Sequence, residues 1–148
     1  MKQLLYIGNK LGSTGKTLTT IDTLSQLLIT EGYTVKTASS KRNKVLRLFD
    51  MLLAIIKYAK STNYVLIDTY STQNFYYAYL CSQLCRLLKL KYIPILHGGN
   101  LPNRLKNSPK LSASLFKKAH INVAPSEYTK SNFEKLGYKN TVCIPNAI

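Results

Sequence analysis

Residues 3–39 read QLLYIGNKLGSTGKTLTTIDTLSQLLITEGYTVKTAS and contain the repeating unit from which we predict the fold. Leu4 to Ile7 form a short apolar run, and a loop rich in Gly, Ser, Thr and Lys follows it. From Thr17 to Glu31 the apolar residues recur at helical spacing, and Gly32 is placed as a C-terminal helix cap. Tyr33 to Ser39 then alternates as a second strand. The unit is therefore strand, loop, helix and strand.

The same alternation continues along the rest of the chain. Further strands are predicted at 64–69, 92–96, 121–124 and 141–144, and further helices at 43–60, 74–88, 112–119 and 127–136. Strands rich in Val, Ile and Leu that alternate with helices favour a parallel sheet covered on both faces. We predict an α/β fold with a doubly wound, mainly parallel, Rossmann-like sheet of about six strands. One long irregular stretch is expected from His97 to Lys110.

Length and composition predict one soluble, cytoplasmic domain. The chain has 148 residues, of which 45% are hydrophobic and 18% charged, as in globular proteins. It contains no apolar run of about 18 residues and no signal-peptide pattern at its start. Its three cysteines include no Cys-x2-Cys pair, so we predict reduced core thiols and no metal site.

Net charge is the strongest compositional feature. The 21 Lys and Arg residues face six acids, which gives a formal net charge of +15. The basic residues cluster at 36–60 and 86–118, and such faces attract nucleic acid, anionic lipid headgroups or phosphorylated substrates. Charge alone does not choose among these partners, and a solvated face that keeps the protein soluble explains it as well.

The predicted helix at 43–60 combines apolar and basic residues. Its apolar residues form one stripe: Val45, Leu48, Phe49, Leu52, Ile55, Ile56 and Ala59. Lys44, Arg47 and Lys57 lie beside the stripe. A core-facing helix is the simpler interpretation. Peripheral attachment to an anionic membrane surface, on its cytoplasmic face, is the further hypothesis.

The loop after the first strand is a candidate phosphate site. Ligands of doubly wound sheets bind at the carboxyl ends of the strands, and here Gly12, Ser13, Thr14, Gly15 and Lys16 precede a helix N-terminus. The sequence Gly-Lys-Thr suggests a nucleotide-binding P-loop, with Asp68 as the acidic strand residue. The register is wrong, however, because Lys10 stands where that motif needs glycine. A P-loop-like nucleotide-binding protein stays as an alternative, and free N–H groups in the loop still favour a phosphate or a sugar hydroxyl.

The last third of the chain resembles a known family in four segments. These segments are 96–100 (LHGGN), 122–126 (NVAPS), 136–138 (LGY) and 143–148 (CIPNAI). Their order resembles the amino-terminal domain of glycosyltransferase family 4, in which strand four ends on His-Gly and strand six runs into Ile-Pro-Asn-Gly-Ile at a hinge. Two departures stand out: Ala147 replaces the hinge glycine, and the first loop has separated glycines at 12 and 15.

The resemblance implies a GT-B enzyme with two Rossmann-like domains. Such an enzyme transfers a sugar from a nucleotide-sugar donor, with retention and without a metal, to a glycan or lipid-linked acceptor in cell-surface polysaccharide or lipopolysaccharide synthesis. Residues 1–144 would be the acceptor-binding domain, and 145–148 would begin the hinge to a missing C-terminal donor domain. The nucleotide sugar would be a co-substrate, no cofactor would be tightly bound, and the fragment alone would be inactive.

Residue roles follow from the same resemblance, except that of Arg104, which follows from its basic side chain in the long loop. His97 matches the family histidine near the reacting sugar and is the predicted catalytic residue. Gly98, Asn100, Arg104 and Ser126 are predicted to bind the acceptor or a phosphate. A solvated loop explains Arg104 as well, and helix capping explains Ser126 equally well.

A non-enzymatic nucleic-acid-binding module is the alternative from another functional class. The basic charge allows it. The sequence has no interleaving of aromatic and basic residues on strands, and Tyr76, Tyr77 and Tyr79 fall on a predicted helix, where packing explains them better. We therefore expect no specific nucleic-acid partner.

Overall fold

The computed structural model describes residues 2–8, 20–38, 43–72, 74–97 and 100–145. Six strands are present in this part of the chain: β1 (Gln3–Ile7), β2 (Thr34–Ala38), β3 (Tyr64–Thr69), β4 (Tyr92–Leu96), β5 (Asn122–Ala124) and β6 (Thr141–Cys143). Six helices accompany them: α1 (Thr20–Thr30), α2 (Lys44–Tyr58), α3 (Asn74–Leu87), α4 (Leu101–Asn107), α5 (Pro109–Phe116) and α6 (Glu127–Lys135).

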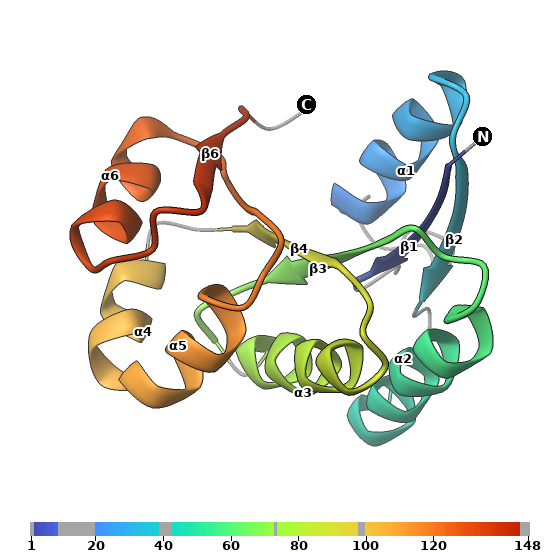
Figure 1. Ribbon diagram of the computed structural model, residues 1–148, viewed down its shortest axis with the longest axis horizontal. Coiled ribbons are helices and arrows are strands. Elements are labelled where there is room, and N and C mark those ends of the chain that lie inside the picture. Colours follow the sequence, from blue (N-terminus) through green and yellow to red (C-terminus); the bar gives the residue numbers. More distant parts are fainter. Residues whose placement is uncertain (1, 9–19, 39–42, 73, 98–99, 146–148) are drawn as a thin grey trace.

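All six strands join one parallel sheet in the order β2-β1-β3-β4-β5-β6 (Figure 1). The predicted α/β, doubly wound architecture is confirmed. From β1 the chain passes to β2 at one edge of the sheet and then to β3, which pairs with the other edge of β1. The direction in which strands are added therefore reverses between β1 and β3. In folds of this type the crevice for ligands opens at that point, outside the carboxyl ends of the strands.

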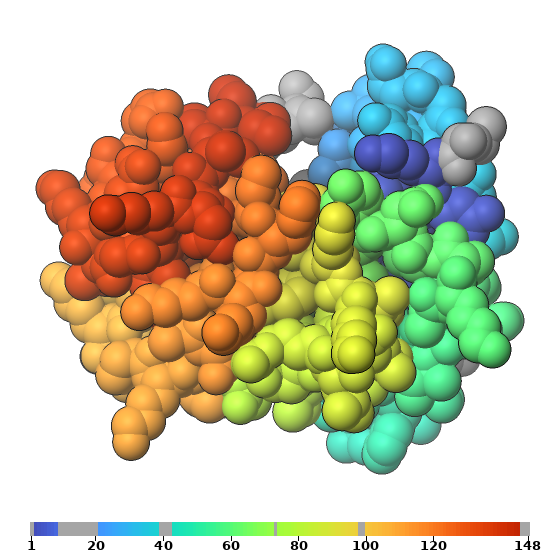
Figure 2. Space-filling model, viewed as in Figure 1, coloured from blue at the N-terminus to red at the C-terminus, as the bar shows by residue number. Residues whose placement is uncertain are grey.

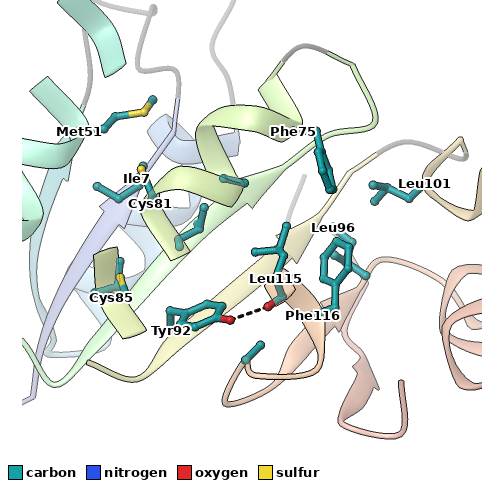
Figure 3. Close-up of a cluster of buried hydrophobic side chains, with 14 of the residues drawn as sticks. Ile7, Met51, Phe75, Cys81, Cys85, Tyr92, Leu96, Leu101, Leu115 and Phe116 are labelled. Atoms are coloured by element: carbon teal, nitrogen blue, oxygen red, sulfur yellow. Dashed lines mark hydrogen bonds between the residues drawn. The ribbon is translucent and has the colours of Figure 1, made fainter. Parts of the chain in front are cut away.

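One face of the sheet carries the main hydrophobic core. Because side chains alternate along a strand, Leu5 and Ile7 of β1 point to the face that α2 and α3 cover. Further along the same face, Phe116 packs edge-on against Phe133, with ring centroids 4.9 Å apart. The Tyr92 hydroxyl donates a hydrogen bond of 2.6 Å to the carbonyl of Leu115, so this buried phenol is satisfied (Figure 3).

The opposite face is covered by α1 and carries a smaller apolar cluster. Leu4, Tyr6, Leu66 and Ile95 of the sheet pack there with Ile21 of α1. Beside α1 the sheet holds a groove of about 330 Å³, which we call the α1 groove. Its lining is apolar throughout: Leu24, Leu28, Leu66, Ile93, Ile95, Leu96, Val123, Pro125, Ile144 and Pro145. In the space-filling view, the α1 and β6 segments stand apart at the top of the molecule (Figure 2).

The irregular stretch predicted from His97 to Lys110 is wrong, because α4 and the start of α5 occupy most of it. Pro102 and Pro109 lie in the first turn of these two helices. Proline is well tolerated there, since the first N–H groups of a helix have no intrahelical partner. The two prolines therefore mark helix starts here, whereas their density in the sequence favoured a loop.

The single core-facing stripe predicted for the helix at 43–60 is also wrong. Met51 and Ile55 of α2 are buried against the sheet, but Val45, Phe49 and Ile56 of the predicted stripe are more than half exposed. The helix begins where expected, because Asn43 Oδ1 accepts hydrogen bonds from the N–H groups of the first turn. Apolar residues thus lie on two opposite sides of α2.

The three cysteines are free, and Cys81 and Cys85 lie in the core as predicted, whereas Cys143 is only half-buried. Cys81 and Cys85 are buried on α3, and burial raises the pKa of both thiols, that of Cys85 to about 12. Within the described residues, no group of three or more His, Cys, Asp and Glu side chains is arranged to hold a metal ion. In the same part of the chain, no helix has the length and apolar character needed to cross a membrane.

Candidate functional site

Three polar side chains from adjacent strands meet at the carboxyl end of the sheet. The Tyr6 hydroxyl on β1 donates a hydrogen bond of 2.8 Å to Asp68 Oδ1 on β3. His97, directly after β4, places its Nε2 2.8 Å from the same carboxyl oxygen. All three residues are buried, with 0% of Tyr6, 6% of Asp68 and 7% of His97 exposed. We call this cluster the Tyr6–Asp68–His97 network.

Strand register explains why these side chains meet. Tyr6 is opposite Leu66, two residues before Asp68, and Asp68 is opposite Ile95, two residues before His97. Residues two apart on a strand share a face, so all three point to the α1 side of the sheet. The N–H of His97 donates to the Thr69 carbonyl at 2.9 Å, which continues the β3–β4 ladder past the end of β4.

Burial and the Asp68 carboxyl keep the phenols of Tyr6 and Tyr70 protonated. Burial, and then the neighbouring Asp68 carboxyl, raise the pKa of Tyr6 far above its ordinary value of 10.0. Tyr70 stacks on the His97 ring, with centroids 4.7 Å apart, and the same two causes raise the pKa of Tyr70 to about 12. Tyr6 therefore serves Asp68 as a hydrogen-bond donor. In a neutral His97 whose Nε2 donates to Asp68, Nδ1 keeps a lone pair that can accept a hydrogen bond, whereas in the imidazolium form both ring nitrogens are donors.

Alkaline pH is expected to destabilise the fold through these tyrosines. A raised pKa in the folded state means that folding favours the protonated phenol. Its contribution is complete below pH 10 and is lost as pH rises toward about 12. Tyr70 alone contributes up to about 2 kcal/mol of this loss. Urea unfolding as a function of pH measures this loss. The free energy of unfolding of Tyr70→Phe is expected to fall less steeply with rising pH than that of the wild type. Equal slopes for the two proteins would contradict this assignment.

Gly8 allows the backbone after β1 to pass directly beside Asp68. Its N–H donates a 2.7 Å hydrogen bond to the Ala38 carbonyl of β2, so its position is fixed. A Cβ atom at Gly8 would overlap Asp68 Oδ2 and lie 3.1 Å from Asp68 Cγ. A side chain at this position therefore requires Asp68, and with it the network, to shift.

The α1 groove lies beside the network, although Tyr6, Asp68 and His97 are not among the residues that line it. Leu66 and Ile95 line the groove, and Asp68 and His97 follow them two residues later on the same face. Leu96 also lines it, at the carboxyl end of β4. The structure thus places a long apolar surface and a buried hydrogen-bonding cluster next to each other at the ligand-binding edge of the fold.

The site residues predicted from the sequence do not all lie together in the structure. His97 lies in the network. Asn100 is exposed before α4, and its Oδ1 accepts a 2.6 Å hydrogen bond from Asn103 Nδ2. Gly12, Ser13, Thr14, Gly15, Lys16 and Gly98 lie outside the described residues. The proposed binding roles of these residues stay predictions.

Arg104 and Ser126 make local contacts away from the network. Arg104 Nε donates to the Ser71 carbonyl at 2.9 Å, and the guanidinium lies 4.9 Å from the centre of the Phe75 ring. It thereby ties the β3–α3 connection to α4. Ser126 is the N-cap of α6, where its Oγ accepts a hydrogen bond from the Thr129 N–H at 3.3 Å. The capping interpretation of Ser126 matches this geometry, and ligand binding by either residue stays a prediction.

Sequence reasoning missed Tyr6 and Tyr70, and it considered Asp68 only as the acid of a nucleotide site. One signal was available: Asp68 interrupts an otherwise apolar strand, and a buried acid requires hydrogen-bonding partners. Its partners on β1 and after β4 were not visible, because strand order and register are not determined by composition or periodicity.

No protein-family model matches this chain, and no curated protein matches it. Among solved structures it is similar to a response regulator receiver domain protein from Clostridium thermocellum, with a TM-score of 0.51 and 15% sequence identity. The match covers 92% of this chain and 94% of that chain. At this identity the similarity shows the fold alone.

The comparison contradicts the glycosyltransferase interpretation, since the fold in hand matches almost the whole of a receiver domain. The predicted family, sugar transfer and role in polysaccharide or lipopolysaccharide synthesis are therefore wrong. The predicted partners fall with them: the missing donor domain, the glycan or lipid-linked acceptor and the anionic membrane surface. The nucleotide-binding and nucleic-acid-binding alternatives find no match either. What the comparison establishes for this chain is a doubly wound fold that a receiver domain shares.

Proposed function

We propose that this chain is a ligand-receiving domain for a small molecule with an apolar body and an anionic end. The α1 groove takes the apolar body, and the anionic end lies at the Tyr6–Asp68–His97 network. One observation carries the proposal: an apolar groove of about 330 Å³ lies beside a buried hydrogen-bonding cluster at the carboxyl ends of the strands. Small-molecule sites commonly combine an apolar lining with a few convergent polar groups in this way.

Three further features support the anionic end. The net charge of +15 raises the local concentration of anions around the domain. Within the network, His97 Nδ1 is the ring nitrogen that is not bonded to Asp68, and in the imidazolium form it can donate a hydrogen bond to an anion. The predicted phosphate loop, residues 12–16, follows β1 in the sequence, and β1 also carries Tyr6. The receiver domain supports signal reception as the class of function only through the shared fold.

Isothermal titration calorimetry with dodecyl phosphate, kept below its micelle-forming concentration, tests the proposal. Dodecyl phosphate is expected to bind the wild type at one site, while inorganic phosphate and dodecanol bind more weakly because each lacks one half of the recognised chemistry. Leu28→Glu, which places a charge in the groove, should weaken binding at least about tenfold. Leu27→Glu is the matched control, since Leu27 is 46% exposed on α1 and is absent from the groove lining.

Two results would overturn the proposal. One is the absence of saturable binding of dodecyl phosphate to the folded wild type. The other is an equal loss of affinity in Leu27→Glu and Leu28→Glu, because the ligand would then not distinguish the two sides of α1. His97→Gln separates the two ends of the site: it should reduce the advantage of dodecyl phosphate over dodecanol and leave dodecanol binding unchanged.

We also infer a cytoplasmic location. The free state of all three cysteines supports it, since reduced thiols are usual in that compartment. Fractionation of source cells tests this inference, and recovery of the protein in an extracytoplasmic fraction would contradict it.

A further inference from the structure

The outward side of α2 is apolar. Five large side chains there are between 55% and 63% exposed: Val45, Leu46, Phe49, Leu53 and Ile56. The opposite side of the helix is buried, with Met51 and Ile55 packed into the main core. A surface helix normally presents polar residues to water. Burying these five side chains against a partner would therefore be favourable.

Four of these residues have the spacing of a helix-pairing seam. Leu46, Phe49, Leu53 and Ile56 follow one another at intervals of 3, 4 and 3 residues, which is the a and d pattern of a heptad. We call these four residues the α2 seam. A seam of this kind is narrow and matches the side of another helix. Helices that lie on bilayers also combine an apolar side with basic residues, so it is the 3–4 spacing of the seam that favours a protein helix.

The charges around α2 indicate which kind of partner helix would bind the seam. Lys44, Lys57 and Lys60 are exposed at the two ends of α2, whereas Asp50 is the single acid between them. A second copy of the chain would bring together two proteins of charge +15, which repel each other. A helix of about 15 residues is only about 22 Å long, so one seam offers little area for a stable homodimer. An acidic helix gains from the same charges.

We propose that the α2 seam binds an acidic amphipathic helix of a partner protein. The partner helix packs apolar residues at 3–4 spacing against Phe49 and Leu53 and places carboxylates near Lys57 and Lys60. The seam lies on the α2 side of the sheet, whereas the α1 groove lies on the opposite side. The two sites therefore use separate surfaces, and binding at the seam does not require a ligand in the groove.

Fluorescence anisotropy with a synthetic helical peptide tests this proposal. The probe carries leucine at its a and d positions and glutamate at the flanking e and g positions, and its control carries lysine at those flanking positions. The wild-type protein should bind the acidic peptide saturably and the lysine peptide at least about tenfold more weakly. Leu53→Lys should abolish most of the binding. Leu87→Lys, at an exposed leucine of α3 outside the seam, should leave the affinity unchanged.

Other occupants would give different results. Sedimentation of the wild type as a dimer that Leu53→Lys converts to a monomer would overturn the proposal in favour of self-association. Cosedimentation with phosphatidylserine vesicles that is lost in Leu53→Lys, together with no peptide binding, would overturn it in favour of a membrane. Equal binding of the two peptides would also overturn it. Circular dichroism of Leu53→Lys should match the wild type, because Leu53 is 63% exposed.

Discussion

Replacing Gly8 with alanine lowers the free energy of unfolding by about 2–3 kcal/mol, since the added methyl overpacks a tight site and displaces a hydrogen-bonded group. The new Cβ would overlap Asp68 Oδ2, and Asp68 cannot turn away freely because Tyr6 and His97 hold its other oxygen. Urea unfolding followed by circular dichroism measures the loss. The same variant should also shift the imidazole NMR signals of His97, since the network moves with Asp68.

Gly32→Ala is the matched control for this prediction. Gly32 has a φ of +100° and open space where a Cβ would lie, so alanine strains only its backbone. The cost should be about 1 kcal/mol, and the His97 signals should stay in place. If Gly8→Ala costs no more than Gly32→Ala and leaves His97 unperturbed, then Gly8 does not act through Asp68.

Replacing Asp68 with alanine is expected to cost about 2–4 kcal/mol, because it leaves two buried groups without their shared hydrogen-bond partner. The Tyr6 hydroxyl and His97 Nε2 both bond to Asp68 Oδ1 at 2.8 Å, and both residues are buried. Equilibrium unfolding in urea measures the change. The pKa of Tyr70, raised to about 12 in the wild type, should fall in this variant because Asp68 is one of its causes.

A double-mutant cycle with Tyr6→Phe tests whether the network acts as a unit. In the Asp68→Ala background, removing the Tyr6 hydroxyl should recover part of the lost stability, since no unsatisfied phenol then remains. We expect a coupling energy of about 1–2 kcal/mol between the two positions. Additive effects of the two substitutions would show that the hydrogen bond contributes little. Ser25→Ala offers a comparison, because this buried hydroxyl lies outside the network.

Periodicity predicted most of the fold and little of the site. Apolar runs and helical spacing placed all six strands and five of the six helices, since these patterns reflect burial directly. The helix α4 was not predicted, because the prolines in that stretch favoured a loop. For α2, spacing identified the helix but could not decide which of its two apolar sides faces the sheet. That choice depends on the strands and on α3, to which the helix docks, so Met51 and Ile55 became core and Phe49 and Leu53 became surface.

The family resemblance failed because its motifs have local physical explanations. Ser126 follows β5 and caps α6, as a serine commonly does at a helix start. Polar residues after strands are common in doubly wound sheets, since ligands bind at that edge. The useful signal at this edge was Asp68. Its importance depends on Tyr6, 62 positions away in the chain, and on His97, 29 positions away.

We propose that the Tyr6–Asp68–His97 network is the polar end of the α1 groove. Methyl and imidazole NMR of the wild type during titration with dodecyl phosphate tests this proposal. The methyl signals of Leu28 and Ile95 and the ring signals of His97 should shift together with one saturation curve, while Leu53 of α2 stays unchanged. Shifts confined to Leu53 and its neighbours, or a His97 ring that does not respond while the groove fills, would separate the network from the ligand site.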